Sequence, residues 1–112
     1  MKSVLIINLI AALCLSAVSA IAQTAVVTDG DTVELDGDVH RVHGIDAPEF
    51  GQTCGTSNWL CGKEATAALE ALVSGHSVHC TEKDRDQYGR AISICVANGK
   101  DVGAELVRMD LA

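Results

Sequence analysis

The sequence predicts a mainly β domain with two helices, of the α+β class. Five short segments are rich in β-branched and other apolar residues and are bounded by glycine-containing turn signals, which is typical of strands. Two further segments repeat apolar residues at the spacing of a helix. The expected order is strand, strand, strand, helix, strand, strand, helix. At 112 residues the chain is long enough for one small domain.

The first three expected strands follow one another closely. They cover Ala25–Thr28, Thr32–Leu35 and Val39–Ile45, and an Asp-Gly pair before the third is a strong signal for a two-residue hairpin. The third strand ends before Pro48, because proline cannot donate a hydrogen bond to a strand ladder. The segment Glu49–Gly62 shows little periodicity, so we expect a loop there.

The second half of the chain holds both helices and the last two strands. Lys63–Val73 is a predicted helix because its apolar residues share one face, and Gly75 ends it. Ser77–Thr81 and Ala91–Val96 are predicted strands that fold back on each other, and Val102–Met109 is a short second helix. This order matches the five-stranded Greek-key barrel known as the OB-fold, which often binds nucleic acid or sugars.

Residues 1–22 are expected to be a secretory signal peptide. A lysine precedes the almost unbroken apolar run Val4–Leu15, and small residues precede two possible cleavage points, after Ala20 and after Ala22. A membrane anchor is the alternative, but the apolar run is shorter than the roughly 20 residues that a span needs. We therefore expect residues 23–112 to form a secreted or periplasmic monomeric domain without a membrane span.

Four cysteines remain in that domain, and an even number in an exported chain indicates two disulfides. Of the three possible pairings, the sequence favours Cys54 with Cys61, which closes a short loop. It also favours Cys80 with Cys95, which lie roughly opposite each other if the last two strands form a hairpin. A zinc site is the alternative, but the chain has no CxxC pair, and the two histidines of the third strand point to opposite faces.

The balance of charge is acidic, with 15 aspartates and glutamates against 8 lysines and arginines and a formal net charge of −7. A protein that binds nucleic acid by charge alone is expected to be basic. Any contact with phosphate must therefore come from a few placed cations or from a metal ion. For most of these carboxylates, solubility is a sufficient explanation.

Two polar segments in the first half of the domain combine carboxylates with an arginine. Asp29 and Asp31 flank a glycine and suit a hard cation, although Asp-Gly is also an ordinary turn signal. Arg41, Asp46 and Glu49 surround the end of a strand, where Asp46 could join Asp31 on a cation. Glu49 could act as a base on a water, and Arg41 could make a two-pronged contact with phosphate. A solvated turn with a surface ion pair is the alternative.

A third segment, Asp86-Gln-Tyr-Gly-Arg90, has the composition of an ordinary hairpin loop but adds the ring of Tyr88 and the guanidinium of Arg90. Together the three segments resemble the staphylococcal-nuclease, or thermonuclease, family. The matching residues occur in family order and span nearly all of residues 24–112. They are Asp29-Gly-Asp-Thr32, Arg41, Gly44-Ile-Asp-Ala-Pro-Glu49, Gly62-Lys-Glu-Ala65, Asp86-Gln-Tyr-Gly-Arg90, Val102, Glu105-Leu-Val-Arg108 and Leu111-Ala112.

The resemblance implies an OB-fold enzyme that uses Ca²⁺ to hydrolyse the phosphodiester bonds of DNA and RNA, leaving 3′-phosphate ends. It also implies a role for each matched residue. The implied calcium ligands are Asp31, Asp46 and the backbone carbonyl of Ala47, with Asp29 beside the metal. Glu49 is implied as the general base, Arg41 and Arg90 as the groups that bind the scissile phosphate, and Tyr88 as an aromatic residue near the nucleotide.

The chain ends at Leu111-Ala112, whereas family members usually continue into a last helix. The resemblance therefore leads us to expect a member that is truncated at its C-terminus and lacks that helix. One competing interpretation is a non-catalytic OB-fold module for oligonucleotide or oligosaccharide, inactive through truncation, and another is an unstable fragment. Retention of all five charged site residues favours the enzyme.

Overall fold

Turn signals near the N-terminal end of the domain produce three short antiparallel strands. The computed structural model describes residues 25–112, and the expected signal segment, residues 1–22, lies outside them. The strands are β1 (Ala25–Asp29), β2 (Thr32–Leu35) and β3 (Asp38–Val42), and β2 pairs with both β1 and β3. The predicted positions of the first two strands agree with the structure to within one residue.

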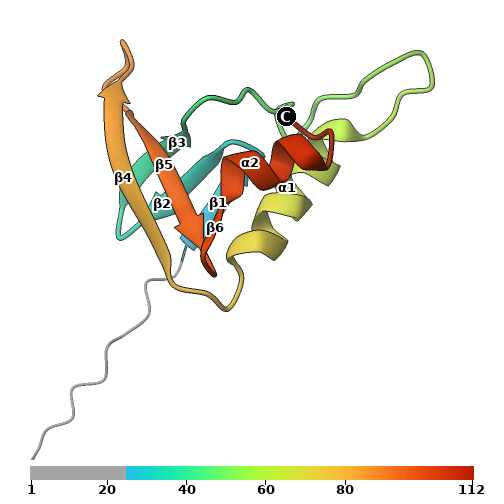
Figure 1. The fold of residues 1–112 in the computed structure, drawn as a ribbon. Coiled ribbons are helices and arrows are strands. Elements are labelled where there is room, and N and C mark those ends of the chain that lie inside the picture. The colour runs from blue at the N-terminus through green and yellow to red at the C-terminus, as the bar shows by residue number, and fades with distance from the viewer. Residues whose placement is uncertain (1–24) are drawn as a thin grey trace, which may run out of the picture.

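Two helices and three strands complete the described chain (Figure 1). They are α1 (Cys61–Val73), β4 (Val78–Arg85), β5 (Ala91–Ala97), β6 (Lys100–Asp101) and α2 (Val102–Arg108). The predicted class, mainly β with two helices, is confirmed. The two-residue strand β6 was not predicted, because it is too short to show a pattern.

The fold agrees with the OB-like α+β fold that the sequence predicted, although its sheet is open and does not close into a barrel. Its order is β1-β2-β3-β5-β4, with β6 paired to β5, and β1 and β4 lie at its two edges within residues 25–112. Helix α1 packs against β1, and α2 packs against β5 and α1 (Figure 1). The parallel pairing of β3 with β5 joins the two halves.

Strand β3 ends three residues before its predicted end at Ile45. Gly44 has a backbone φ of +82°, which turns the chain out of the extended conformation. His43 still donates its backbone N–H to the carbonyl of Ser93 at 2.8 Å, so the segment that follows β3 starts from a fixed position. Residues 43–49 are therefore irregular but anchored.

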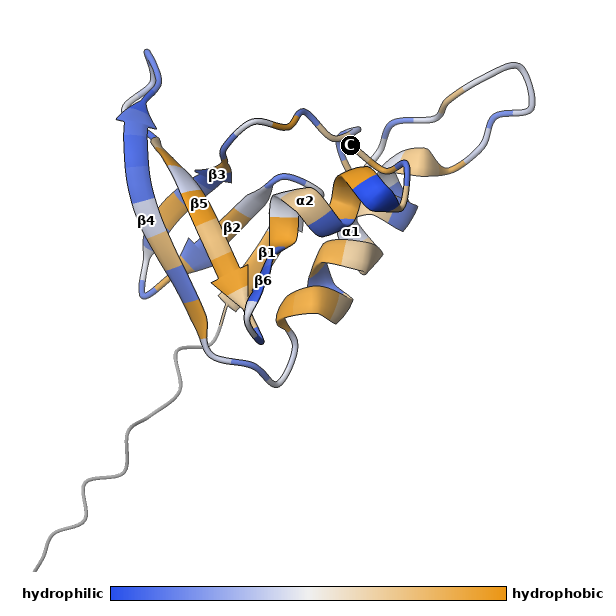
Figure 2. Cartoon of the chain, viewed as in Figure 1, coloured by the Kyte–Doolittle hydropathy of each residue, from blue (hydrophilic) through white to orange (hydrophobic). Residues whose placement is uncertain are grey.

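Strand β4 extends four residues beyond the predicted end at Thr81, through a run of exposed polar residues. Figure 2 shows this end of β4 as hydrophilic. The pairing with β5 continues to Arg85 opposite Ala91, and the turn is closed by the backbone N–H of Asp86 donating to the carbonyl of Arg90 at 3.0 Å. Backbone pairing in a solvated hairpin does not require apolar side chains, so hydropathy underestimates its length.

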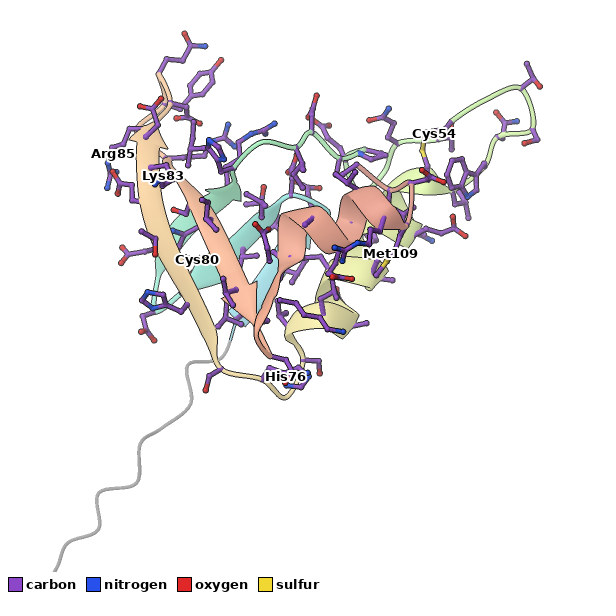
Figure 3. The ribbon with its side chains drawn as sticks, viewed as in Figure 1. Cys54, His76, Cys80, Lys83, Arg85 and Met109 are labelled. Atoms are coloured by element: carbon purple, nitrogen blue, oxygen red, sulfur yellow. A yellow bond between two sulfur atoms is a disulfide. The ribbon has the colours of Figure 1, made fainter. Side chains whose placement is uncertain are left out.

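Two disulfides hold loops in the structure. Cys54 pairs with Cys61 in the loop before α1, and Cys80 on β4 pairs with Cys95 directly opposite on β5. Figure 3 shows Cys54 and Cys80 on well-separated parts of the molecule. These are the two pairings that the sequence favoured. Closing the 15-residue segment between Cys80 and Cys95 is expected to stabilise the fold by about 3 kcal/mol.

The core is aliphatic. Its buried side chains come from both halves of the sheet and from both helices, and Leu69 and Leu106 are completely inaccessible to solvent. The cluster comprises Val33, Leu35, Val42, Leu69, Val73, Val78, Cys95, Ala97, Val102 and Leu106, with no aromatic residue from the described part of the chain. Within residues 25–112, neither helix combines the length and the hydropathy needed to cross a membrane.

Helix α1 lies unusually close to the backbone of two loops. A Cβ atom on Gly62 would fall 1.7 Å from the carbonyl oxygen of Glu49, and one on Gly30 would fall 2.6 Å from the Cβ of Ala65. Only glycine fits at these two contacts. The helix therefore supports both the β1–β2 turn and the loop after β3.

We expect Gly62→Ala to destabilise the protein by at least about 2 kcal/mol, because the added methyl overlaps the backbone of Glu49 and Phe50. Helix propensity alone predicts the opposite sign, a gain of about 1 kcal/mol. The matched control is Gly103→Ala in α2, where the nearest atom lies 3.1 Å away, and we expect a change within about 1 kcal/mol. Urea unfolding of the two variants measures the difference, and equal stabilities would contradict this account of α1.

Candidate active site

Asp31 is a buried carboxylate in the turn between β1 and β2, with 5% of its surface exposed. Its Oδ1 accepts the hydroxyl of Thr32 at 3.0 Å, and its Oδ2 accepts the backbone N–H of Ala47 at 3.1 Å. A buried charge requires such partners, because desolvation otherwise disfavours it strongly. Asp31 therefore ties the β1–β2 turn to the loop that follows β3.

Arg41 brings the two predicted metal carboxylates together. Its Nη2 atom lies 3.5 Å from Oδ2 of Asp31 and donates a hydrogen bond of 3.1 Å to Oδ1 of Asp46. The Asp31 side chain is 7% exposed and that of Asp46 is 88% exposed, so one carboxylate is built into the fold and the other reaches solvent. The positively charged guanidinium of Arg41 thus lies between the two carboxylates.

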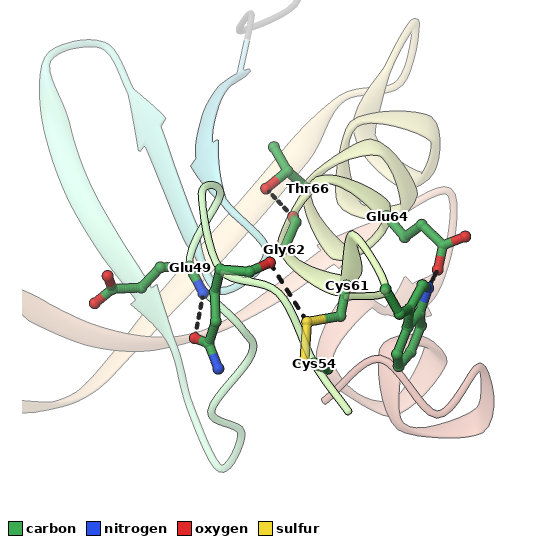
Figure 4. Close-up of a disulfide and its surroundings, with 8 residues drawn as sticks. Glu49, Cys54, Cys61, Gly62, Glu64 and Thr66 are labelled. Atoms are coloured by element: carbon green, nitrogen blue, oxygen red, sulfur yellow. Dashed lines mark hydrogen bonds between the residues drawn. A yellow bond between two sulfur atoms is a disulfide. The ribbon is translucent and has the colours of Figure 1, made fainter. Parts of the chain in front are cut away.

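Glu49 lies beside this cluster in a pocket of about 310 Å³, which is lined by Asp46, Ala47, Pro48, Glu49 and Gln52. The Glu49 side chain is exposed, but its backbone is fixed (Figure 4). Its N–H donates to Oε1 of Gln52 at 3.2 Å, and its carbonyl accepts the N–H of Gln52 at 2.8 Å. The Glu49 carboxylate is therefore accessible to water, while its backbone is held by hydrogen bonds.

The same loop is anchored to both neighbouring elements. Gly62 of α1 donates its backbone N–H to the carbonyl of Gln52 at 3.1 Å, and Phe50 donates its N–H to Oδ1 of Asp29 at 2.9 Å. The Sγ atom of Cys61 lies 3.5 Å from the same Gln52 carbonyl (Figure 4). Asp29, predicted to lie beside a metal, thus uses one carboxylate oxygen to hold the loop that carries Glu49.

Arg90 is held by the β4–β5 turn. Oδ2 of Asp86 accepts its Nε at 2.7 Å, and Oδ1 of Asp86 accepts the backbone N–H groups of Tyr88 and Arg90, both at 2.9 Å. Desolvation acts to raise the pKa of Asp86, but these hydrogen bonds and the charge of Arg90 outweigh it, so its pKa is lowered. The Arg90 guanidinium also lies over the Tyr88 ring, 5.6 Å from its centroid.

The two arginines come from neighbouring parts of the sheet. Arg41 is in register with Ile92 on the neighbouring strand β5, and Arg90 lies just before the first residue of that strand, Ala91, which is in register with His40.

Not all of the predicted site is preassembled. Asp31, Arg41 and Asp46 are in direct contact, and Glu49 lines a pocket with Asp46. Within residues 25–112, no hydrogen bond or ion pair joins Arg90 to these four residues. In the same described segment, no group of three or more histidine, cysteine, aspartate or glutamate side chains is arranged to hold a metal.

Sequence reasoning missed the residues that position the site. Gln52, Gly62 and Asp86 received no individual role, yet they fix the Glu49 loop and the Arg90 turn. For Asp86 a signal was available, since an aspartate that starts a turn often accepts backbone N–H groups two to four residues later. For Gly62 no local signal was available. A side chain is excluded there by the backbone of Glu49, 13 residues earlier in the chain.

Two comparisons show which known proteins the chain resembles. The model of the family described as "Staphylococcal nuclease homologue" matches residues 40–112. The chain is also 40% identical over 88 residues to the "Succinoglycan biosynthesis protein ExoI" of Rhizobium meliloti (strain 1021), an alignment that covers 74% of this chain. It covers 46% of that relative, so the chain spans about half of its length.

The lowered pKa of Asp86 predicts how this turn contributes to stability at different pH values. A carboxylate with a depressed folded pKa stabilises the fold above its ordinary value of 3.8, and this contribution is lost as the pH falls through the folded pKa. Asp86→Asn should therefore melt below the wild type at neutral pH, and the gap should shrink below pH 3.8. Asp84→Asn, an exposed control on β4 two residues before Asp86, should show little gap at any pH. Thermal melts across this range test the assignment, and a gap that widens in acid would refute it.

Proposed function

Because the chain belongs to the family of staphylococcal nuclease homologues, we propose that it is an exported, calcium-dependent endonuclease that hydrolyses phosphodiester bonds of DNA and RNA. The observation that supports this best is the contact of Arg41 with Asp31 and Asp46 beside the pocket that Glu49 lines. In this proposal, that end of β3 carries the oxygen ligands, the base and one phosphate-binding cation. Arg90, which precedes the neighbouring strand β5, is proposed to contribute the second cation.

The oxygen donors at this end of β3 fit a calcium ion. Two carboxylates already converge on a single positive group, and oxygen atoms are the ligands that Ca²⁺ prefers. The residues that would hold the ion are Asp31, Asp46 and, through its carbonyl, Ala47. When bound, Ca²⁺ supplies a Lewis acid and offsets negative charge on the substrate.

The residues of the chain account for the remaining chemistry. Glu49 accepts a proton from the water that attacks phosphorus, and its exposure leaves it accessible to that water. The bond from phosphorus to the 5′ oxygen breaks, which leaves a 3′-phosphate on one fragment and, once that oxygen gains a proton, a 5′-hydroxyl on the other. Arg41 and Arg90 stabilise the additional negative charge as phosphorus gains a fifth oxygen.

We further propose that residues 1–22 direct export and that residues 23–112 act as a monomer in the periplasm or outside the cell. The two disulfides support this part of the proposal, because such bonds persist in oxidising compartments. They also stabilise a small domain whose core lacks large aromatic side chains.

An oligosaccharide-binding role is the second candidate, and two observations favour it. The relative from Rhizobium meliloti is named for succinoglycan biosynthesis. A second pocket of about 380 Å³ is lined by Asp38, His40, Glu82, Arg85 and Arg90, among others. Arg85 is paired with Glu82, so the lining carries balanced charges, which suits a neutral hydroxylated ligand better than a polyanion.

We expect Glu49→Gln to lower the turnover of single-stranded DNA by about 10²- to 10⁴-fold, because it removes the base. Glu70→Gln, an exposed carboxylate on α1 outside the site, is the matched control and should retain wild-type turnover. Each protein is assayed with Ca²⁺ and with chelator, which should abolish the wild-type activity. Activity that survives the chelator, or an unaffected Glu49→Gln, would refute the mechanism. A folded protein that cleaves nothing but binds oligosaccharide would support the second candidate.

A further inference from the structure

All three aromatic residues of the chain lie on its surface. The sequence contains one phenylalanine, one tryptophan and one tyrosine. Phe50 is 50% exposed, Trp59 is 44% exposed and Tyr88 is 75% exposed. Aromatic side chains normally contribute much of a core, yet the core here is built from aliphatic side chains and cysteine. Single exposed apolar residues are common on protein surfaces, so a functional role for these rings has to be argued from their positions.

Phe50 immediately follows Glu49 in the chain, and its backbone is held from two sides. Its N–H donates to Oδ1 of Asp29 at 2.9 Å, and its carbonyl packs so closely on α1 that a Cβ on Gly62 would lie 2.7 Å from it. These contacts fix the Phe50 main chain next to the pocket that Glu49 lines. An exposed ring on a fixed backbone loses little freedom when a flat ligand covers it.

Tyr88 lies in a comparable way beside Arg90. Its ring lies under the guanidinium of Arg90, and its backbone N–H is held by Asp86. The proposed site therefore has two exposed rings beside it, Phe50 next to Glu49 in the chain and Tyr88 next to Arg90. Trp59 differs, because it lies in the disulfide-closed loop and its Nε1 donates to Glu64 of α1.

The charge of the protein makes such rings important for binding. At a formal net charge of −7, the chain cannot gain much affinity from the general attraction between a basic protein and a polyanion. Stacking of a base on an aromatic ring does not depend on charge and tolerates any base sequence. It requires an unpaired base whose face is accessible, which a duplex does not offer.

We propose that Phe50 is a stacking platform for an unpaired base next to the scissile phosphate, on the Glu49 side. The location of the scissile phosphate rests on the proposed function, whereas the preference for unpaired bases rests on the exposed ring itself. Single-stranded nucleic acid is then the favoured ligand, and the bases as well as the phosphates contribute to binding. No role for Phe50 follows from the three segments that indicated the family.

The test measures equilibrium binding with chelator present, so that no cleavage is needed. The probes are a labelled oligothymidylate of about 12 nucleotides, an abasic strand of equal length with the same phosphates, and a duplex. Phe50→Leu keeps an apolar side chain but removes the ring, and Phe50→Trp keeps a ring. Val107→Ala on α2, where the native side chain is also 50% exposed, is the matched surface control.

We expect the wild type to bind oligothymidylate more tightly than either the abasic strand or the duplex. Phe50→Leu should weaken oligothymidylate binding roughly tenfold and leave abasic binding unchanged, while Phe50→Trp and Val107→Ala remain close to wild type. Equal binding of the two single strands by the wild type, no measurable binding of either, or no effect of Phe50→Leu would overturn the platform. Base-dependent binding without cleavage in the Ca²⁺ assay would refute the nuclease proposal and leave the platform standing.

Discussion

The close approach of helix α1 to two loops is the constraint on which the candidate site depends. Gly30 lies against Ala65 of the helix, and Gly62 of the helix lies against the backbone of Glu49 and Phe50. These contacts set the positions of the β1–β2 turn, which carries Asp31, and of the loop after β3, which carries Glu49. Irregular segments are usually the least ordered parts of a domain. Here a buried helix face fixes them, so the Glu49 side chain is exposed on a backbone that is held in place.

The local arrangement of charge offsets the acidity of the whole chain. Arg41 is shared by Asp31 and Asp46, and Arg90 is bound by Asp86. Each arginine is thus oriented by a carboxylate, which in the proposed mechanism would reduce the entropy lost on binding a phosphate. The arrangement would also have a cost, because the phosphate would compete with these carboxylates. A divalent cation on Asp31 and Asp46 would relieve that competition for Arg41, which gives a physical reason to couple metal and substrate binding.

The two disulfides compensate for a core that contains no aromatic side chain. The Cys80–Cys95 bond joins β4 to β5 near the middle of their pairing, and the turn that carries Tyr88 and Arg90 lies at the far end of this hairpin. Cys54–Cys61 closes the loop immediately before α1. With few large side chains inside, covalent links replace part of the burial that aromatic residues usually provide. All three rings then remain outside, where a nucleic acid could meet them.

The sequence by itself determined the class of the fold, the order of its main elements and the family, because turn signals, periodicity and ordered motifs are local properties of the chain. It also favoured the cysteine pairs that the structure contains, since one pair is near in sequence and the other follows from a hairpin. The tertiary structure alone decided that the sheet stays open, with the helices packed against β1 and β5, and that α2 covers the small side chains of β5. It decided that Gly30 and Gly62 have no space for a side chain, and that Arg41 links Asp31 to Asp46 whereas Arg90 pairs with Asp86. These outcomes depend on contacts between residues distant in the chain, and the alternation of side chains cannot reveal which face another element will cover.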